Sequence, residues 1–173
     1  MNSPGDEYLP FLKEAGCDPG VIEHCLVVRD VAVRIASDIV NAGTDVDTCL
    51  VAAGAVLHDI GRSKTHGMAH ADEGGVICRS LGIDERVCLI VERHIGAGLK
   101  ADERAKLGLR PVDRLPETLE EKIVAHADNM VRGSRILCKE EFATSLEKFD
   151  EQVRSRFLML SDELERLRQP ANC

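Results

Sequence analysis

The chain has 173 residues, of which 44% are hydrophobic and 3% aromatic, and its formal net charge at pH 7 is −8. This length suits one domain with one core, and the scarcity of aromatic residues favours packed helices built from Leu, Ile, Val and Ala. An acidic chain is a poor non-specific binder of nucleic acid, because such binding requires cations that neutralise phosphates. We therefore expect a single all-α helical bundle over residues 1–173.

Start and stop signals predict helices along most of the chain. Asp18 followed by Pro19 is typical of a helix start, and the apolar spacing continues from there to about Val40. No run alternates between apolar and polar residues as a strand would. In chain order we expect helices over Glu7–Ala15, Pro19–Val40, Asp47–His58, His70–Leu81, Asp84–His94 and Asp102–Leu107, and a last one from a Thr118–Glu121 capping box through Asp128.

A long amphipathic pattern fills the C-terminal part of the chain, from Glu140 to Arg168, with room for one break. Apolar residues recur along it every three or four positions, from Phe142 to Leu167. We interpret this stripe as core or as a contact between copies, so a homodimer is possible. The segment 140–168 then follows a motif-bearing region at about 21–135 within the same domain.

The seven cysteines form no C-x-x-C pair. Cys25, Cys49, Cys78 and Cys88 fall within apolar helical patterns, so we interpret them as reduced thiols that act as small hydrophobic residues. The N-terminal residues lack the pattern of a signal peptide, and no apolar run approaches the roughly 20 residues that a membrane span needs. These features predict a cytoplasmic protein that does not associate with membranes.

Side chains able to bind metals occupy helix ends along the whole sequence. A His-Asp pair at one helix end is, by itself, more often a cap than a ligand. A bundle that brought several such ends together would instead form one metal pocket, since imidazole and carboxylate suit divalent Fe, Mn, Ni, Zn and Mg. The candidate ligands are His24, His58, Asp59, His70, His94 and Asp128.

These residues carry a resemblance to the HD-domain metal-dependent phosphohydrolases. His24, the pair His58-Asp59 and Asp128 resemble the family's H…HD…D pattern, and "HDIG" at 58–61 is a common form of its centre. The segments "HADEGGVICRSLGI" and "VERHIGAG" resemble the further histidine motifs of members that bind two metals. The nearest branch is that of the bacterial hydrolases of symmetrical diadenosine tetraphosphate.

The resemblance implies the chemistry as well as the fold. His24, His58, Asp59 and Asp128 would hold one divalent metal, and His70 and His94 a second, with Asp59 bridging the two. Such a dinuclear site would activate water to cleave a phosphoester or phosphoanhydride of a small phosphorylated substrate, which we expect to be a nucleotide. Asp59 would orient the water.

Other polar residues near this pattern are weaker candidates for a role in the site. Arg62 and Lys64 follow the His-Asp pair and would either contact a substrate phosphate or remain solvated. His66 would either protonate a leaving group or be an ordinary loop histidine. Arg132 and Arg135 are weaker candidates for phosphate contact. His126 lies two residues before Asp128, so on a helix it points away from that ligand and is expected to be partly buried or supporting.

Three alternatives to a two-metal hydrolase stay open. One is a mononuclear nucleotidase in which His70 and His94 line the pocket without binding metal. Another is a di-iron oxygenase of the kind that myo-inositol oxygenase represents within the same superfamily, because the ligand set would be similar. The third is a non-catalytic nucleotide-binding module.

Overall fold

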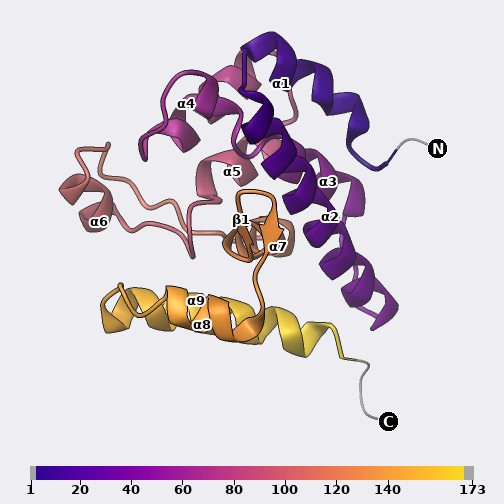
Figure 1. The fold of residues 1–173 in the computed structure, drawn as a ribbon, viewed down its shortest axis with the longest axis vertical. Coiled ribbons are helices and arrows are strands. Elements are labelled where there is room, and N and C mark those ends of the chain that lie inside the picture. The colour runs from indigo at the N-terminus through magenta and orange to yellow at the C-terminus, as the bar shows by residue number, and fades with distance from the viewer. Residues whose placement is uncertain (1–2, 170–173) are drawn as a thin grey trace.

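The computed structural model describes residues 3–169, which form nine α-helices, two short 3-10 helices and one two-stranded hairpin (Figure 1). The all-α expectation is therefore confirmed. The helices are η1 (Asp6–Tyr8), α1 (Leu9–Ala15), α2 (Pro19–Asn41), α3 (Thr48–Leu57), η2 (Ile60–Ser63), α4 (His70–Ser80), α5 (Glu85–Arg93), α6 (Ala101–Lys106), α7 (Leu119–Asn129), α8 (Lys139–Ser145) and α9 (Glu151–Leu167).

Helix α3 is the centre of the fold. The Asp47 side chain caps its start by accepting a hydrogen bond from the backbone N–H of Leu50 at 2.9 Å. Every residue from Leu50 to Leu57 is buried, and α3 contacts α2, α5 and α7. A Cβ at Gly54 would lie 2.7 Å from Ile90 side-chain atoms, so glycine lets α5 approach closely. Because α3 is buried up to its C-terminal end, the residues that follow it also lie in the interior of the protein.

Most predicted helix ends agree with the structure to within one or two residues, but the capping box at Thr118 is only half formed. The Thr118 hydroxyl accepts from the N–H of Glu121 at 3.3 Å. The Glu121 carboxylate turns away and accepts from the N–H of Glu117 and from the guanidinium of Arg93. The buried ion pair with Arg93 thus replaces the second arm of the box.

Two features of the C-terminal third differ from a plain helical pattern. Strands β1 (Val131–Arg132) and β2 (Arg135–Ile136) form an antiparallel hairpin that was not predicted, because two-residue strands are too short to show alternation. The long amphipathic segment is broken once, between α8 and α9, where Asp150 accepts from the N–H of Val153 at 2.9 Å and starts the second helix.

Helices α8 and α9 form a layer that crosses one end of the molecule beneath α7 (Figure 1). Phe157, Leu160 and Leu164 of α9 are buried, so the predicted stripe belongs to the core. No helix of residues 3–169 is long and apolar enough to span a membrane. The expectation for Cys49 is wrong, since it is exposed on the first turn of α3, whereas Cys25, Cys78 and Cys88 are buried free thiols.

Candidate metal centre

The structure brings all the candidate ligands into one cluster, from five separate parts of the chain. His24 lies in the second turn of α2, and Asp128 lies near the end of α7. The remaining four are at or next to helix ends: His58 and Asp59 follow α3, His70 begins α4 and His94 follows α5. The ligand atoms form overlapping groups of three within which all atoms lie within 4.8 Å of one another.

Asp59 stands between two pairs of histidines. Its Oδ1 lies 3.1 Å from Nε2 of His70 and 3.6 Å from Nε2 of His94. Its Oδ2 lies 3.8 Å from Nε2 of His24 and 3.7 Å from Nε2 of His58. The two oxygens of one carboxylate thus face opposite halves of the cluster.

Asp128 lies closest to one of these halves, although its carboxylate is also within 4.8 Å of a ring nitrogen of His94. Its Oδ1 lies 3.0 Å from Nε2 of His24 and 3.5 Å from Nε2 of His58. Burial raises the pKa of this carboxyl, but the two imidazoles beside it outweigh burial and hold the pKa below its usual range. The same balance, with His58, His70 and His94 as neighbours, lowers the pKa of Asp59. Both carboxyls are therefore carboxylates at neutral pH.

Backbone carbonyls hold each imidazole with its Nε2 directed inward. The Nδ1 atoms of His58, His70 and His94 lie 2.8, 2.8 and 2.7 Å from the carbonyl oxygens of residues 55, 67 and 91. His24 makes the same contact at 2.8 Å with the carbonyl of Gly133. A carbonyl only accepts, so Nδ1 carries the proton and Nε2 of a neutral ring is free to bind a metal. Burial also lowers the pKa of His94, which favours its neutral form.

The donor set fits divalent cations. Oδ1 of Asp59 is buried and has no hydrogen-bond partner among the described residues, which is costly for a charged oxygen unless a cation is nearby. Facing Nε2 atoms lie 3.3 Å apart in the pair His24 and His58 and 3.1 Å apart in the pair His70 and His94. Imidazole nitrogens and carboxylate oxygens without thiolates suit Fe, Mn, Ni, Zn or Mg.

Gly61 explains why the turn after Asp59 can pack so tightly. A Cβ at this position would overlap the backbone carbonyl oxygen of His70 and approach the N of Gly74. Glycine therefore lets η2 rest directly on the first turn of α4, and that contact sets His70 beside Asp59. The glycine of "HDIG" thus supports the metal ligands through backbone packing.

A pocket of about 430 Å³ opens onto the cluster. One wall comes from the helices that carry the ligands, and His24, Asp128 and Asn129 lie on it. The opposite wall is aromatic and comes from the C-terminal layer, with Phe142, Phe149 and Phe157. A substrate would therefore lie between the metal ligands and α8 and α9.

Arg62 is the one predicted phosphate-contacting residue of the "HDIGRSK" turn that lines this pocket. Its Nε lies 2.6 Å from Oδ2 of Asp59. The structure does not bring Lys64 or His66 to the pocket. Both are exposed, and Nε2 of His66 lies 3.9 Å from a carboxylate oxygen of Asp18 on the outer side of the loop. A helix start at His70 instead of earlier leaves His66 in the solvated loop.

His126 lies away from the cluster, as its spacing from Asp128 predicts. It is buried with its ring edge-on to Phe142 at a centroid distance of 5.8 Å. Burial lowers its pKa to about 4, so the ring is neutral at physiological pH.

Several pocket residues escaped sequence-based interpretation. Asn129 donates to the carbonyl oxygen of Gly96 at 2.8 Å, and Lys148 and Phe149 lie at the break between α8 and α9. Only the sequence next to the aspartate motif could have suggested Asn129. Lys148 and Phe149 carried no signal, because their pattern equally fits a packing helix.

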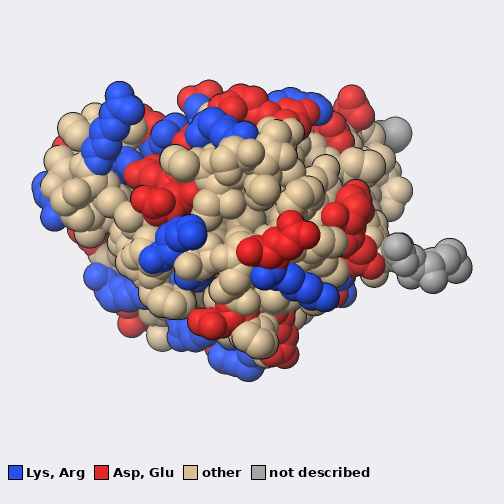
Figure 2. Space-filling model, turned by 90° about the horizontal axis from the view of Figure 1, so that it is seen from above, with Lys and Arg blue, Asp and Glu red and all other residues tan. Residues whose placement is uncertain are grey.

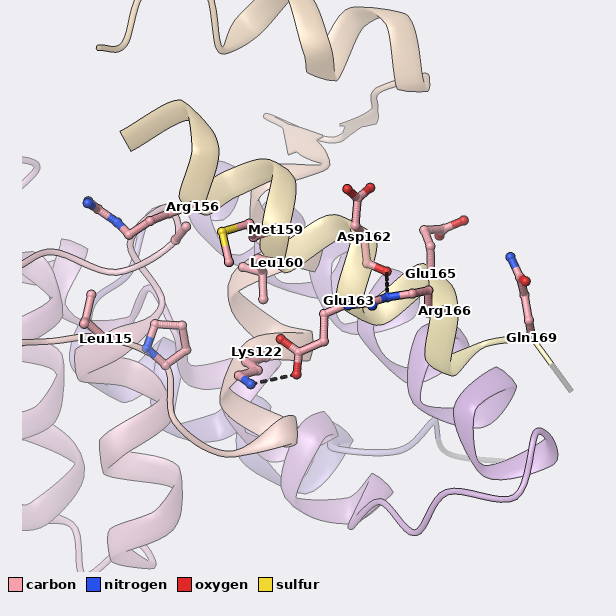
Figure 3. Close-up of a pocket in the computed structure, with 12 residues that line it drawn as sticks. Leu115, Lys122, Arg156, Met159, Leu160, Asp162, Glu163, Glu165, Arg166 and Gln169 are labelled. Atoms are coloured by element: carbon pink, nitrogen blue, oxygen red, sulfur yellow. Dashed lines mark hydrogen bonds and ion pairs between the residues drawn. The ribbon is translucent and has the colours of Figure 1, made fainter. Parts of the chain in front are cut away.

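A larger pocket of about 670 Å³ lies along α9 and contains none of the clustered ligands (Figure 3). Its lining mixes apolar residues such as Met159 with paired charges such as Lys122 and Glu163, whose contact is 2.7 Å long. The face in Figure 2 shows acidic and basic side chains side by side and no continuous basic band.

The HD-domain family model matches residues 21–133, and the chain belongs to this family. The match includes every candidate ligand. The solved HD domain of the phosphodiesterase PgpH from L. monocytogenes has the same fold, with a TM-score of 0.59 at 18% identity over 92% of this chain and 99% of that one. A second structure of that domain, in complex with cyclic-di-AMP, is similar at a TM-score of 0.59 and 17% identity over 95% and 100%.

Curated relatives extend the comparison at higher identity. The uncharacterized protein MJ0778 of Methanocaldococcus jannaschii is 46% identical over 94% of this chain and 97% of its own length. Proteins named tRNA (cytidine(56)-2'-O)-methyltransferase from Picrophilus torridus and Thermoplasma volcanium are 49% and 48% identical over 76% and 75% of this chain. The chain matches only 37% of the length of each methyltransferase.

Proposed function

We propose that this protein is a phosphohydrolase that uses two divalent cations to cleave a phosphoester or phosphoanhydride bond of a nucleotide. The observation that carries the proposal is the convergence of four imidazole Nε2 atoms on the two carboxylates Asp59 and Asp128, with each Nδ1 held by a backbone carbonyl. HD-family membership and the fold shared with a phosphodiesterase domain support it.

The division of the cluster supports two cations over one. His24, His58 and Asp128, whose facing atoms lie 3.0–3.5 Å apart, would hold one of them, and His70 and His94 the other. Asp59 would bridge the two, because its two oxygens face the two halves. A mononuclear nucleotidase would leave the close Nε2 contact of His70 and His94 without a cation.

Cations bound there would lower the pKa of a water molecule and polarise a phosphoryl oxygen. The chain's own residues would supply the rest. Asp59 is the carboxylate placed to orient the water, since it lies at the middle of the cluster. Arg62 is placed to contact a phosphate oxygen, because its guanidinium lies at the pocket and its contact is with a ligand carboxylate. Burial of the ligands excludes bulk water from the reacting atoms.

The relatives bear on the substrate. The PgpH HD domain binds a nucleotide, cyclic-di-AMP, which supports a nucleotide for this chain. The methyltransferase names carry less weight, because the alignment covers 37% of those proteins and an alignment of 132 residues necessarily includes most of the HD-matched segment. We therefore do not extend methyl transfer to this chain. Free cysteines at six described positions support our proposal that the protein acts in the cytoplasm.

A substrate screen tests the proposal. The protein loaded with Mn²⁺, Fe²⁺, Ni²⁺, Zn²⁺ or Mg²⁺ should hydrolyse at least one member of a panel of nucleotides and phosphodiesters. Asp59→Asn should lower kcat/KM at least roughly 100-fold, whereas Asp102→Asn on the exposed face of α6 should have no effect. Full turnover by Asp59→Asn would rule the mechanism out, and oxygen uptake by the iron-loaded protein would point to the oxygenase instead.

A further inference from the structure

Two basic side chains at the mouth of the site pocket have no ionic partner. Arg132 of strand β1 and Lys148, between α8 and α9, both line the pocket and are both exposed. Neither makes an ion pair or a hydrogen bond to another side chain within residues 3–169. Their neighbours differ, since Arg135 pairs with Glu141 at 2.7 Å and Lys139 pairs with Glu165 at 3.1 Å.

Both cations lie at the rim of the site pocket, in a chain whose net charge is −8. Acidic side chains are abundant enough to neutralise them, as Glu141 neutralises Arg135, which lies opposite Arg132 in the hairpin. Arg132 and Lys148 also share a second, neighbouring pocket, which they line together with Arg135, Glu140 and Glu141. That outer pocket carries three basic and two acidic side chains, and of these only the basic Arg132 and Lys148 also line the site pocket, so they form its positive edge.

An aromatic surface lies next to this edge. The ammonium of Lys148 is 5.0 Å from the ring centroid of Phe149, and Phe149 stacks on Phe157 at a centroid distance of 5.3 Å and an interplanar angle of 18°. Phe149 is only partly buried and lines the pocket. A partly exposed ring beside a cation suits a nucleotide, whose base can stack while its phosphate pairs with the charge.

We infer that Arg132 and Lys148 form a second anion-binding subsite, which holds a phosphate group of the substrate other than the one that is cleaved. The inference rests on the proposed function and deepens it. The metal centre can neutralise one phosphate, so a substrate with a single phosphate would leave these two cations unpaired. The substrate class is therefore nucleotides with a further phosphate group, such as cyclic or linear dinucleotides and dinucleoside oligophosphates.

This subsite lies largely outside the segment that defines the family. The HD match ends at residue 133, whereas Lys148, Phe149 and Phe157 come from the C-terminal layer. Arg132 lies at the very end of the match, next to Gly133, whose carbonyl holds His24. The residues that select the substrate would thus come mainly from the C-terminal layer, and the hairpin would connect that layer to the part of the chain that carries the metal ligands.

Steady-state kinetics of the metal-loaded protein test the inference. The variants are Arg132→Gln, Lys148→Gln and the double variant, and the matched control is Arg135→Gln, which removes the paired charge across the hairpin. The substrates are cyclic-di-AMP, a dinucleoside tetraphosphate and bis(p-nitrophenyl) phosphate, which has one phosphate. Each single variant should raise KM for one of the two nucleotides about tenfold, leave kcat within about twofold, and leave the aryl diester unaffected.

Equal effects on nucleotides and on the aryl diester, or equal effects of Arg135→Gln and Arg132→Gln, would overturn the inference while hydrolysis itself stands. If the wild-type protein hydrolyses none of the three, the proposed function fails on these substrates and calorimetric binding of the two nucleotides decides the subsite. Weaker binding by Arg132→Gln and Lys148→Gln, with unchanged binding by Arg135→Gln, would support it. Equal binding by all of them, or no binding by the wild-type protein, would overturn it.

Discussion

The Nε2 atoms of His70 and His94 lie 3.1 Å apart, although the Nδ1 atom of each ring is held by a backbone carbonyl. With the proton on Nδ1, each Nε2 presents a lone pair to the other. Two such lone pairs repel one another unless a positive charge lies between or beside them. The Oδ1 of Asp59, 3.1 Å from Nε2 of His70, adds a negative charge to the same place. A bound cation would offset the repulsion among these three atoms.

Metal binding should therefore stabilise the fold. Adding Mn²⁺ or Zn²⁺ to chelator-treated protein at about 100 times its Kd should contribute about 2.7 kcal/mol for each cation bound, so one filled site alone should raise Tm by roughly 5–10 °C in differential scanning fluorimetry. His58→Ala should lose the part of this response that comes from the cation it helps to hold, whereas His66→Ala, in the exposed loop, should keep all of it. An unchanged Tm for the wild-type protein would contradict the assignment of the cluster as a metal centre.

Gly61 should be intolerant of any side chain. Gly61→Ala places a methyl group against the carbonyl of His70, so we expect a loss of about 1–3 kcal/mol in the free energy of unfolding and weaker metal binding through displacement of His70. Gly67→Ala is the matched control in the same loop, because its Cβ would meet only the Thr65 hydroxyl, at 3.5 Å. Urea denaturation and metal titration of both variants measure the difference. Similar behaviour of the two would refute the packing role.

His126 should make the fold sensitive to acid. Its pKa falls from 6.5 to about 4 because of burial, so the unfolded chain binds a proton more readily than the folded protein. Stability is then fully present above pH 6.5 and is lost as the pH falls through that value. Relative to His126→Leu, wild-type stability should fall by about 2 kcal/mol between about pH 7.5 and pH 5. If the free energy of unfolding changed with pH in the same way for both proteins, a buried neutral His126 would be excluded.

Glu92 should be important for stability although it binds no metal. This buried carboxylate lies 2.7 Å from Nη1 of Arg79 and 2.9 Å from Nη1 of Arg114, and so ties α4, α5 and the segment before α7 together. Glu92→Ala should cost about 1–3 kcal/mol, since Arg114 loses its closest carboxylate while Arg79 keeps its pair with Glu85. Asp102→Asn, which breaks an exposed pair with Lys106, should cost less than about 1 kcal/mol. Equal costs in chemical denaturation would contradict this distinction.

The sequence predicted those parts of the fold that depend on local signals. Asp47 and Asp84 cap α3 and α5 as expected, and the ends of those helices fix where His58 and His94 lie. The ligand cluster followed from a resemblance to a family with several separate motifs. The sequence shows Gly61 as part of a motif. It does not show why glycine is needed there, because the contact with the His70 carbonyl forms only when α4 packs on η2.

The parts that escaped prediction depend on packing between distant segments. Glu121 prefers the buried charge of Arg93 to its local capping partner, and the sequence does not show that Arg93 lies beside it. Lys148 and Phe149 become pocket residues only because the chain breaks between α8 and α9 and that layer faces the ligands. Helical periodicity identifies an apolar face but does not say what lies opposite it.

The metal content of the protein tests the central claim most directly. Chelator-treated protein titrated with Mn²⁺ in a calorimeter should bind two equivalents per chain, and His94→Ala should bind one, because only the half formed by His70 and His94 is lost. One equivalent bound by both proteins would contradict the dinuclear site, and no binding by the wild-type protein would contradict the metal centre altogether.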